Sequence, residues 1–234
     1  MTSKLLFCGA AGVGKGTFAK RVAPVLGLHH ISAGDLLREN VKQQTPVGRL
    51  CAGFLKEGEL VPGNVVVDIV KEKVNQLKHS PTYKGYILDG FPRCVEQAEL
   101  WASEGDGTPD LAVNITLNHD VLVTKLTSRR VCDSCGDNYN LADIRYGQFD
   151  MPPMLPKIPD VCDSCGGRLA QREDDKEETV KKRLRLHAAT EGDLLAWFRE
   201  RTTVVDFQVV RGIKQTDELI DLVRGFRQGS LAQL

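Results

Sequence analysis

Short apolar runs alternate with longer stretches of helical periodicity along most of this chain. The apolar runs cover residues 4–8, 86–88, 111–117 and 203–205. We expect each of them to be a buried strand, because a strand that is covered on both faces forms a nearly continuous apolar run. Their alternation with helical stretches predicts an α/β fold, in which helices cover both faces of a parallel sheet.

The pattern changes between the first helix and residue 86, where the signals are mostly helical. Gly34 and Asp35 precede the apolar residues of a helix start, and a turn over residues 60–64 ends this region. An amphipathic helix is expected over residues 65–77. Residues 32–64 are therefore a candidate helical lobe, inserted into the main domain.

A second and clearer interruption runs from about residue 131 to residue 170. It contains four cysteines, several glycines and the proline-rich run 151–156, so a continuous helix does not fit. Helical periodicity returns at Glu177, with acidic residues in the first turn. We expect residues 129–172 to form a separate inserted lobe. The core would then consist of residues 1–31, 65–128 and 173–234.

A glycine-rich stretch, Gly-Ala-Ala-Gly-Val-Gly-Lys-Gly-Thr at residues 9–17, follows the first apolar run directly and precedes a helix. In such a turn the backbone N–H groups point inward, the glycines let them approach phosphate oxygens, and the helix N-terminus adds positive potential. Lys15 is placed to reach the outer phosphates of a nucleotide. The usual spacing puts a hydroxyl directly after the lysine, whereas here Gly16 intervenes and Thr17 carries the hydroxyl. This offset narrows the field to one branch of phosphate-loop proteins. The strand, the lysine and the helix around the loop argue against a glycine-rich turn without a ligand.

A second candidate phosphate-handling motif spans residues 85–93, where a short apolar strand ends in Asp89, Gly90 and Arg93. An aspartate at the carboxyl end of a parallel strand, beside a phosphate loop, can hold the water ligands of a bound Mg2+. The forked guanidinium of Arg93 can bind a second phosphate. Taken alone, the same residues could be an acid that caps a turn and an arginine that faces solvent.

Arginines recur at the edges of both interruptions. They are Arg38, Arg129, Arg130, Arg172 and Arg183. Phosphoryl transfer requires little covalent chemistry from a protein, so cationic groups that align the substrates and neutralise the moving oxygens suit it. Asp174 and Asp175, next to Arg172, could orient these arginines or act as a hinge latch. A solvated charged loop explains the same acids equally well.

The second interruption carries an internal repeat, because Val-Cys-Asp-Ser-Cys-Gly occurs at residues 131–136 and again at 161–166. Each Cys-x-x-Cys offers two thiolates to one metal ion, and two of them complete a tetrahedral shell of four sulfur atoms. We prefer zinc to iron because the site is structural and closed. The expected ligands are Cys132, Cys135, Cys162 and Cys165. Two disulfides and a thioredoxin-type redox site are the alternatives.

The 234-residue chain is 41% hydrophobic, enough for one substantial core with smaller inserted lobes. Its 31 Lys and Arg residues balance 31 Asp and Glu residues, and 6% of the residues are aromatic. Neither feature favours binding to nucleic acid. No apolar stretch approaches the roughly 20 residues that span a bilayer, and the first strand begins too early for a signal peptide. We expect a cytoplasmic protein without nucleic-acid or membrane partners.

In their order and spacing, these motifs resemble those of adenylate kinases of the long type, which have a metal-binding lid. The resemblance covers nearly the whole chain. It includes the offset loop, Ile-Ser-x-Gly-Asp-Leu-Leu-Arg at 31–38, Leu-Val-Pro at 60–62, Gly-Tyr-Ile-Leu-Asp-Gly-Phe-Pro-Arg from 85, Arg-Arg-Val-Cys from 129, and the charged run at 172–183. It implies a parallel-sheet core with a protruding acceptor-binding lobe and a protruding lid.

The resemblance also implies roles for individual residues. ATP would be bound by Gly12, Val13, Gly14, Lys15, Gly16, Thr17, Arg129, Asn138, Tyr139 and Lys214. AMP would be bound by Ala33, Arg38, Glu59, Leu60, Val61, Gly90, Phe91, Pro92, Arg93, Gln97, Arg172 and Arg183. The catalytic residues would be Lys15, Asp89, Arg93, Arg129, Arg172 and Arg183, with Asp89 acting through magnesium-bound water. The implied reaction is reversible transfer from MgATP to AMP, which gives two ADP, by an enzyme expected to be a monomer.

Three positions bear on the choice of substrate. Ala33 stands where the family usually has threonine, as it does in uridylate-cytidylate kinases. Gln97 and the long lid favour AMP, since those kinases carry asparagine at the corresponding position and have a short lid. Lys125 replaces a frequent arginine near the donor base and cannot stack as a planar guanidinium does, so ATP and GTP both stay open as donors.

Four alternatives to an ATP:AMP kinase are a uridylate-cytidylate kinase, a GTP:AMP phosphotransferase, a nucleotide-binding switch protein and a zinc-ribbon nucleic-acid binder. The balanced charge and the 6% of aromatic residues argue against the nucleic-acid binder. The arginines around two presumed phosphate sites argue against a switch, which needs one nucleotide site and no acceptor clamp.

Overall fold

A parallel five-stranded sheet forms the centre of the structure, a computed structural model that describes residues 3–229. Its order is β10-β4-β1-β3-β2, and every neighbouring pair is parallel. The bounds are β1 Ser3–Cys8, β2 His29–Ser32, β3 Gly85–Asp89, β4 Leu111–Thr116 and β10 Thr203–Gln208. Because β2 and β3 lie on one side of β1 and β4 and β10 on the other, the carboxyl end of β1 is a switch point, where such sheets bind ligands.

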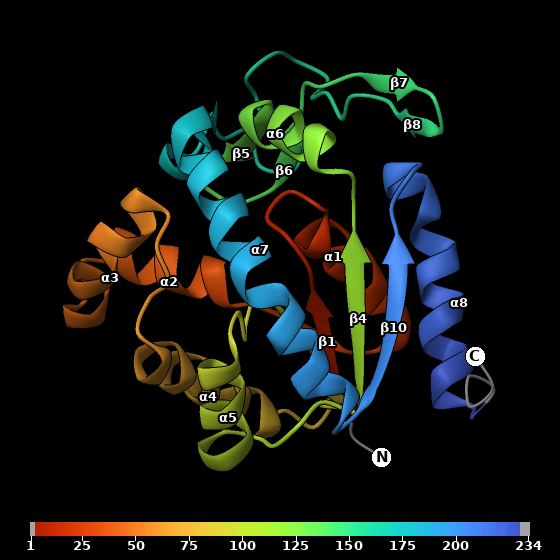
Figure 1. Cartoon of the computed structure of the whole chain (residues 1–234). Helices are drawn as coiled ribbons and strands as arrows, with labels where there is room; N and C mark the ends of the chain where they lie inside the picture. The colour runs from red at the N-terminus through yellow and green to blue at the C-terminus, as the bar shows by residue number, and fades with distance from the viewer. Residues whose placement is uncertain (1–2, 230–234) are drawn as a thin grey trace.

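Helices cover both faces of this sheet. Alternate side chains of β1 point to opposite faces, so that Leu5 and Phe7 join one buried cluster whereas Leu6 and Cys8 join the other. The first cluster includes residues of α1 (Lys15–Leu26), α6 (His119–Thr127) and α8 (Thr216–Arg227), and the second includes residues of α4 (Gly63–Lys78), α5 (Val95–Glu104) and the end of α7 (Glu177–Arg199). In Figure 1, α7 crosses in front of the sheet. The predicted α/β fold is confirmed.

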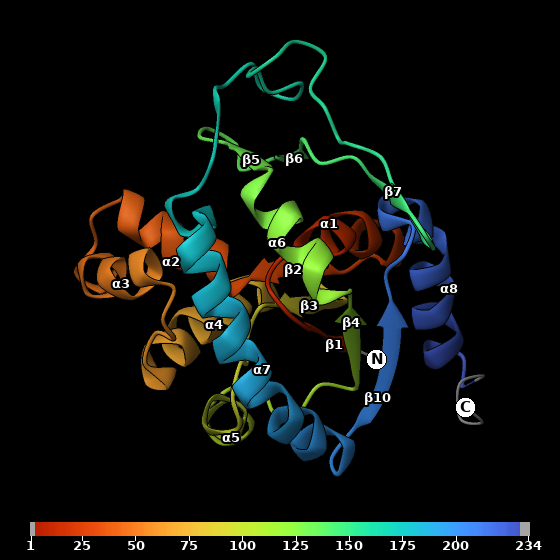
Figure 2. The same cartoon turned by 45° about the horizontal axis from the view of Figure 1, so that its top comes forward.

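A pair of short helices, α2 (Ala33–Lys42) and α3 (Pro46–Glu57), projects from one side of the sheet (Figures 1 and 2). Each helix begins after a hydroxyl residue that caps it. Ser32 Oγ accepts a hydrogen bond from the Asp35 N–H at 3.3 Å, and Thr45 Oγ1 accepts one from the Gly48 N–H at 2.9 Å. The expected helical character of residues 32–64 is therefore present.

The second inserted segment, which we call the lid (residues 129–172), lies above the carboxyl ends of the strands (Figure 1). It contains an antiparallel sheet of β5 (Arg129–Cys132), β6 (Asn138–Asn140) and β9 (Leu169–Ala170), and a hairpin of β7 (Ile144–Tyr146) and β8 (Phe149–Met151). The hairpin is not separate from the core, because Ile144, Phe149 and Met151 belong to the same buried cluster as Leu5. The lid is thus docked on the core.

The two edge strands are the part of the sheet that the apolar pattern predicts least well. β2 was not expected, since His29, His30 and Ser32 are polar and only Ile31 is buried. β10 continues beyond residue 205 to Gln208, with exposed polar residues along it. Edge strands are covered less completely than central ones, so they lack a continuous apolar run. Within residues 3–229, no helix is long and apolar enough to cross a membrane.

The contact between α2 and α3 depends on a glycine. A Cβ at Gly48 would lie 2.0 Å from the Asn40 carbonyl oxygen and 2.7 Å from the Val41 nitrogen. Because backbone atoms cannot move aside as a flexible side chain can, Gly48→Ala should lower the free energy of unfolding by about 1–3 kcal/mol. Urea denaturation followed by circular dichroism measures this change. Gly53→Ala, in the same helix with open space around it, is the control and should raise stability by about 0.5–1 kcal/mol. Equal stability of the two variants would contradict this packing.

Candidate active site

A continuous cleft lies at the carboxyl ends of β1 and β3, where the sheet has its switch point. Its walls come from the loop after β1, from α2, from the lid and from α7. The predicted loop residues that line it are Gly12, Val13, Gly14, Lys15, Gly16 and Thr17. A smaller pocket beside it is lined by Ala33, Glu59, Leu60, Val61, Gly90 and Gln97, and shares Arg38, Arg93 and Arg183 with the cleft. Most of the residues predicted from the sequence therefore lie around one space.

The lysine of the phosphate loop is held by the loop itself. Lys15 Nζ donates to the carbonyl oxygens of Gly9 at 2.7 Å and Ala10 at 2.8 Å. Burial lowers the pKa of Lys15 to about 8, while the charge of Asp89 acts in the opposite direction. Gly9 has a φ of +123°, and a Cβ there would lie 2.1 Å from the Ile115 carbonyl oxygen. The loop can therefore lie against β4 only with glycine at this position.

Asp89 ends β3 beside the loop, with its side chain largely buried. A Cβ on Gly16 would lie 2.9 Å from Asp89 Oδ2, so the additional glycine of the offset motif leaves room for this carboxylate. His30, on the neighbouring β2, places Nε2 at 3.3 Å from the same oxygen. Sequence reasoning missed His30, because it lies in the strand that the apolar pattern does not predict.

Two acidic residues that precede α7 hold two of the predicted arginines. Arg129 donates to Asp175 from Nε to Oδ2 at 2.8 Å and from Nη2 to Oδ1 at 2.6 Å, a bidentate contact. Arg183 lies 2.8 Å from Asp174 and 3.5 Å from Asp175. Asp175 is fully buried. These acids orient arginines, as one interpretation predicted, and the alternative of a solvated charged loop is wrong for Asp175.

Asp35 forms ion pairs with two further arginines of the cleft. Its Oδ1 lies 2.6 Å from Arg38 and 3.3 Å from Arg172. Burial alone would raise the pKa of Asp35, but the charges of Arg38 and Arg172 outweigh burial and lower this pKa to about 2. The sequence marks Asp35 only as part of a helix start. Its contact with Arg172 depends on how the lid docks, which no local pattern shows.

Arg93 differs from the other arginines of the cleft. Its Nε donates to the Gly90 carbonyl at 2.8 Å, and in the described part of the chain it makes no ion pair with a carboxylate. Burial, together with the charges of Arg183 and Arg38, lowers the pKa of Arg93 to about 10. A guanidinium that lines the cleft without an acidic partner is well suited to bind an anion.

The Gln97 amide is buried and only partly engaged by the protein. Its Oε1 accepts from the Arg93 N–H at 2.9 Å, and its Nε2 donates to the Val61 carbonyl at 3.3 Å. One N–H and one lone pair of the amide are left for a ligand. Phe91, in contrast, packs edge-on against Trp101 in the core, so its side chain supports the pocket from behind.

Two predicted side chains are engaged away from the cleft. The Glu59 carboxylate pairs with Lys182 at 2.9 Å on the surface. Lys214 pairs with Asp150 of the lid hairpin at 2.6 Å, although its neighbour Ile213 lines the cleft. Any contact of these two residues with a nucleotide would therefore come from the backbone or require the ion pair to open.

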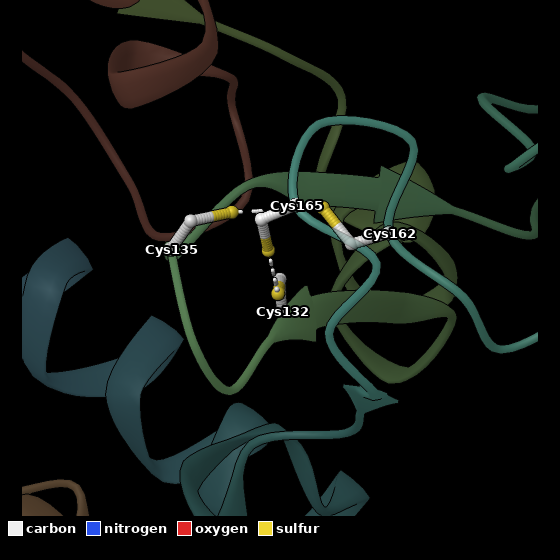
Figure 3. Close-up of side chains that lie close together, drawn as sticks. All are labelled: Cys132, Cys135, Cys162 and Cys165. Carbon is white, nitrogen blue, oxygen red and sulfur yellow. Dashed lines mark hydrogen bonds between the residues drawn. The ribbon is translucent and has the colours of Figure 1, made fainter.

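The four cysteines of the repeat converge in the lid (Figure 3). Cys132 Sγ lies 3.4 Å from Cys165 Sγ, Cys135 Sγ lies 3.5 Å from Cys162 Sγ, and all four sulfur atoms lie within 4.8 Å of one another. Sulfur atoms bound tetrahedrally to one zinc at about 2.3 Å lie about 3.8 Å apart, whereas those of a disulfide lie about 2.05 Å apart. The cluster therefore fits a single metal ion. Tyr139 directs its hydroxyl to Cys162 Sγ at 3.6 Å.

Sequence reasoning also missed part of the wall that α7 contributes. Thr190 Oγ1 donates to the Arg93 carbonyl at 3.0 Å, and His187 lies 3.3 Å from Glu191. All three α7 residues line the cleft, as does Arg183 one turn earlier. Helical spacing could have placed them on the same face as Arg183, but no motif indicated that this face is functional.

The chain is similar to known proteins over most of its length. Residues 7–203 match the family model described as adenylate kinase. The chain is 41% identical over 223 residues to the adenylate kinase of Thermodesulfovibrio yellowstonii, which covers 94% of this chain and 96% of that protein. It is 37% identical over 228 residues to the adenylate kinase of Bacillus subtilis, a match that covers 96% of this chain and 99% of that protein. It is 33% identical over 228 residues to a GTP:AMP phosphotransferase of Plasmodium falciparum, a match that covers 96% of this chain and 97% of that protein.

Proposed function

The chain belongs to the adenylate kinase family and is a nucleoside monophosphate kinase that transfers a phosphoryl group from ATP to AMP, and we propose how its residues divide this task. One observation carries the proposal: a single cleft joins the phosphate loop to Arg38, Arg93, Arg129, Arg172 and Arg183. The loop lies in one half, and the pocket around Gln97 adjoins the other. Two anionic substrates can thus meet there with their phosphates between the arginines.

The donor is assigned to the loop and the lid. Backbone N–H groups from Gly12 to Thr17 and the positive end of α1 suit its phosphates. Lys15 is held close to them by the loop carbonyls and adds its charge to the outer phosphates. Arg129 and Asn138 face the same space from the lid.

The acceptor is assigned to the arginines and to the smaller pocket. Arg93, which has no carboxylate partner in the described part of the chain, offers its guanidinium to the monophosphate, while Arg38 and Arg172 are kept nearby by Asp35. The free N–H and lone pair of Gln97 match the adenine edge, which presents an acceptor and a donor side by side. Ala33, Leu60 and Val61 supply the apolar wall of this pocket.

Catalysis follows from alignment and charge. Arg129, Arg172 and Arg183 line the cleft together with the phosphate loop, where they can neutralise the oxygens of the transferred group. A bound Mg2+ would supply further positive charge at the donor phosphates, and the oxygens of Asp89 and Thr17 beside the loop are ligands of the kind it prefers. The docked lid keeps water from the terminal phosphate, so transfer competes well with hydrolysis.

The metal of the lid is assigned as structural zinc. The supporting observation is the small buried cluster of the lid, which consists of Cys132, Tyr139, Cys162 and Leu169. So few buried residues cannot by themselves hold the part of the lid outside the hairpin, whereas four thiolates around one ion can.

The chain divides into a core and two inserted lobes. The projecting helices and the lid support an acceptor lobe over residues 32–64, a lid over residues 129–172 and a core formed by the remainder. Action as a monomer stays a prediction from the resemblance. A cytoplasmic location without nucleic-acid or membrane partners stays a prediction from composition.

Lys15→Met should lower turnover about 100- to 1000-fold without loss of the fold, because the charge of Lys15 acts on the transferring phosphates and not on the core. A coupled assay of ADP formation from ATP and AMP measures turnover, and circular dichroism checks the fold. Lys181→Met is the control, since within residues 3–229 this partly exposed lysine on α7 forms ion pairs only with Glu177 and Glu178. A Lys15 variant that kept most of the wild-type turnover would remove Lys15 from the mechanism.

Gln97→Leu should reduce kcat/KM for AMP about tenfold or more and bring it toward the values for CMP and UMP, because the adenine edge loses both partners. The same assay with each nucleoside monophosphate measures the preference. Gln97→Glu keeps the acceptor for the Arg93 N–H and is the matched variant; it should also lose the preference for AMP. Equal rates on AMP and CMP in the unmutated protein would contradict the acceptor assignment.

Elemental analysis should find about one zinc per chain, and Cys132→Ala should lower both the zinc content and the melting temperature. Cys51→Ala, which removes a buried thiol outside the lid, should keep the zinc and serves as the control. Metal-free protein with four freely titratable lid thiols would rule out the zinc assignment.

A further inference from the structure

One lysine of α1 contacts the lid. Lys20 lies on the helix that begins at Lys15, at the end of the phosphate loop. Its Nζ donates to the Gly136 carbonyl at 3.0 Å and lies 3.4 Å from Asp137 Oδ1. Both acceptors follow Cys135 directly, and α1 lies beneath β6 of the lid in Figures 1 and 2. The helix that starts at the phosphate loop is therefore joined to the cysteine repeat.

A second lysine contacts the same part of the repeat. Lys42, in the last turn of α2, donates from Nζ to the Asp133 carbonyl at 3.1 Å. Asp133 lies between Cys132 and Cys135, in the segment that we call the first knuckle (residues 132–136). The first knuckle is thus contacted by ammonium groups from two elements, one of the core and one of the helical lobe.

A metal-filled cysteine cluster attracts such ammonium groups. Four thiolates around one divalent ion carry a net charge of about −2. Asp137 adds a further negative charge, and it accepts a 2.5 Å hydrogen bond from Ser164 Oγ, between the cysteines of the second half of the repeat. Asp137 therefore joins both halves of the repeat and offers its other carboxylate oxygen to Lys20.

The Gly136 carbonyl connects Lys20 to the cleft. It accepts a second hydrogen bond, at 3.4 Å, from Asn138 Nδ2, and Asn138 lines the cleft. The first knuckle fixes this carbonyl, because Gly136 turns the chain with a φ of +73° and its N–H donates to the Cys132 carbonyl at 3.0 Å. In the proposed function, on which this inference rests, Asn138 meets the donor. Lys20 can thus act on the donor site through one backbone carbonyl.

We propose that Lys20 and Lys42 are positioning residues that dock the metal-filled first knuckle on α1 and α2, and that Lys20 thereby keeps Asn138 at the donor side of the cleft. Neither lysine is among the described residues that line the cleft, so their effect does not require contact with a substrate. The coupling is reciprocal, because contacts that favour docking strengthen the binding of both the metal and the donor.

The test uses zinc-loaded protein and measures how fast zinc passes to a chromophoric chelator. Lys20→Met should speed this release about 3- to 10-fold and Lys42→Met about 2- to 5-fold, because each loses an ammonium group that docks the first knuckle. Lys20→Arg keeps the charge and should restore most of the wild-type rate. Lys181→Met should release zinc as the wild type does. In about 1 M salt, which screens charges beyond about 3 Å, the difference between the wild type and Lys20→Met should shrink.

Steady-state kinetics gives a second readout. At saturating AMP, Lys20→Met should raise the KM for MgATP about 3- to 10-fold and change kcat less, since the lysine acts on docking of the lid and not on the transferred group. MgATP without AMP should slow zinc release from the wild type, and should slow it less in Lys20→Met.

Three outcomes would overturn the inference. The first is equal zinc release from the wild type, Lys20→Met and Lys181→Met. The second is a loss of kcat at an unchanged KM for MgATP, which would show that Lys20 acts on the reaction itself. If the variants fail to fold, the wild type decides, because zinc release that neither salt nor MgATP alters would refute the coupling. ADP formation from ATP and AMP would leave the proposed function intact in each case, whereas its absence would refute that function.

Discussion

Positive charge gathered in a desolvated cleft is the constraint on which the rest of this structure depends. Burial lowers the pKa of Lys15 to about 8 and that of Arg93 to about 10, so holding both charged costs folding free energy. The charge of Asp89 offsets part of this cost at both groups. Asp35, Asp174 and Asp175 pair with other arginines of the cleft. The positive charge that the carboxylates do not neutralise can attract phosphates. The same groups that reduce the stability of the fold therefore also favour the binding of nucleotides.

The carboxylates also explain how arginines from different segments are held in one place. Arg129 comes from the lid, yet it is held by Asp175 next to α7. Arg172 ends the lid and contacts Asp35 on α2, so the lid and the helical lobe meet through charge. The lid hairpin adds a backbone bond from Asp150 to Val210 in the core at 2.9 Å. Docking of the lid and alignment of the arginines therefore depend on the same contacts, and a docked lid limits the access of water to bound phosphates.

Sequence alone predicts the features that are encoded in contiguous motifs. The loop with Lys15, the strand that ends at Asp89 and the cysteine repeat each combine a fixed spacing with a local geometry, and their positions in the structure agree with that expectation. Contacts between distant segments could not be predicted in this way. The His30–Asp89 contact joins residues 59 positions apart through an edge strand with polar residues, and the Asp35–Arg172 contact spans 137 positions and depends on lid docking.

The central claim is that the cleft passes a phosphoryl group directly between two nucleotides and keeps it from water. 31P nuclear magnetic resonance of the unmutated protein with MgATP and AMP tests this claim most directly, because it detects every phosphorus product at once. The account predicts that two ADP form for each AMP consumed, that ADP supplied alone yields ATP and AMP, and that inorganic phosphate stays negligible. Steady release of inorganic phosphate from ATP, independent of AMP, would contradict it.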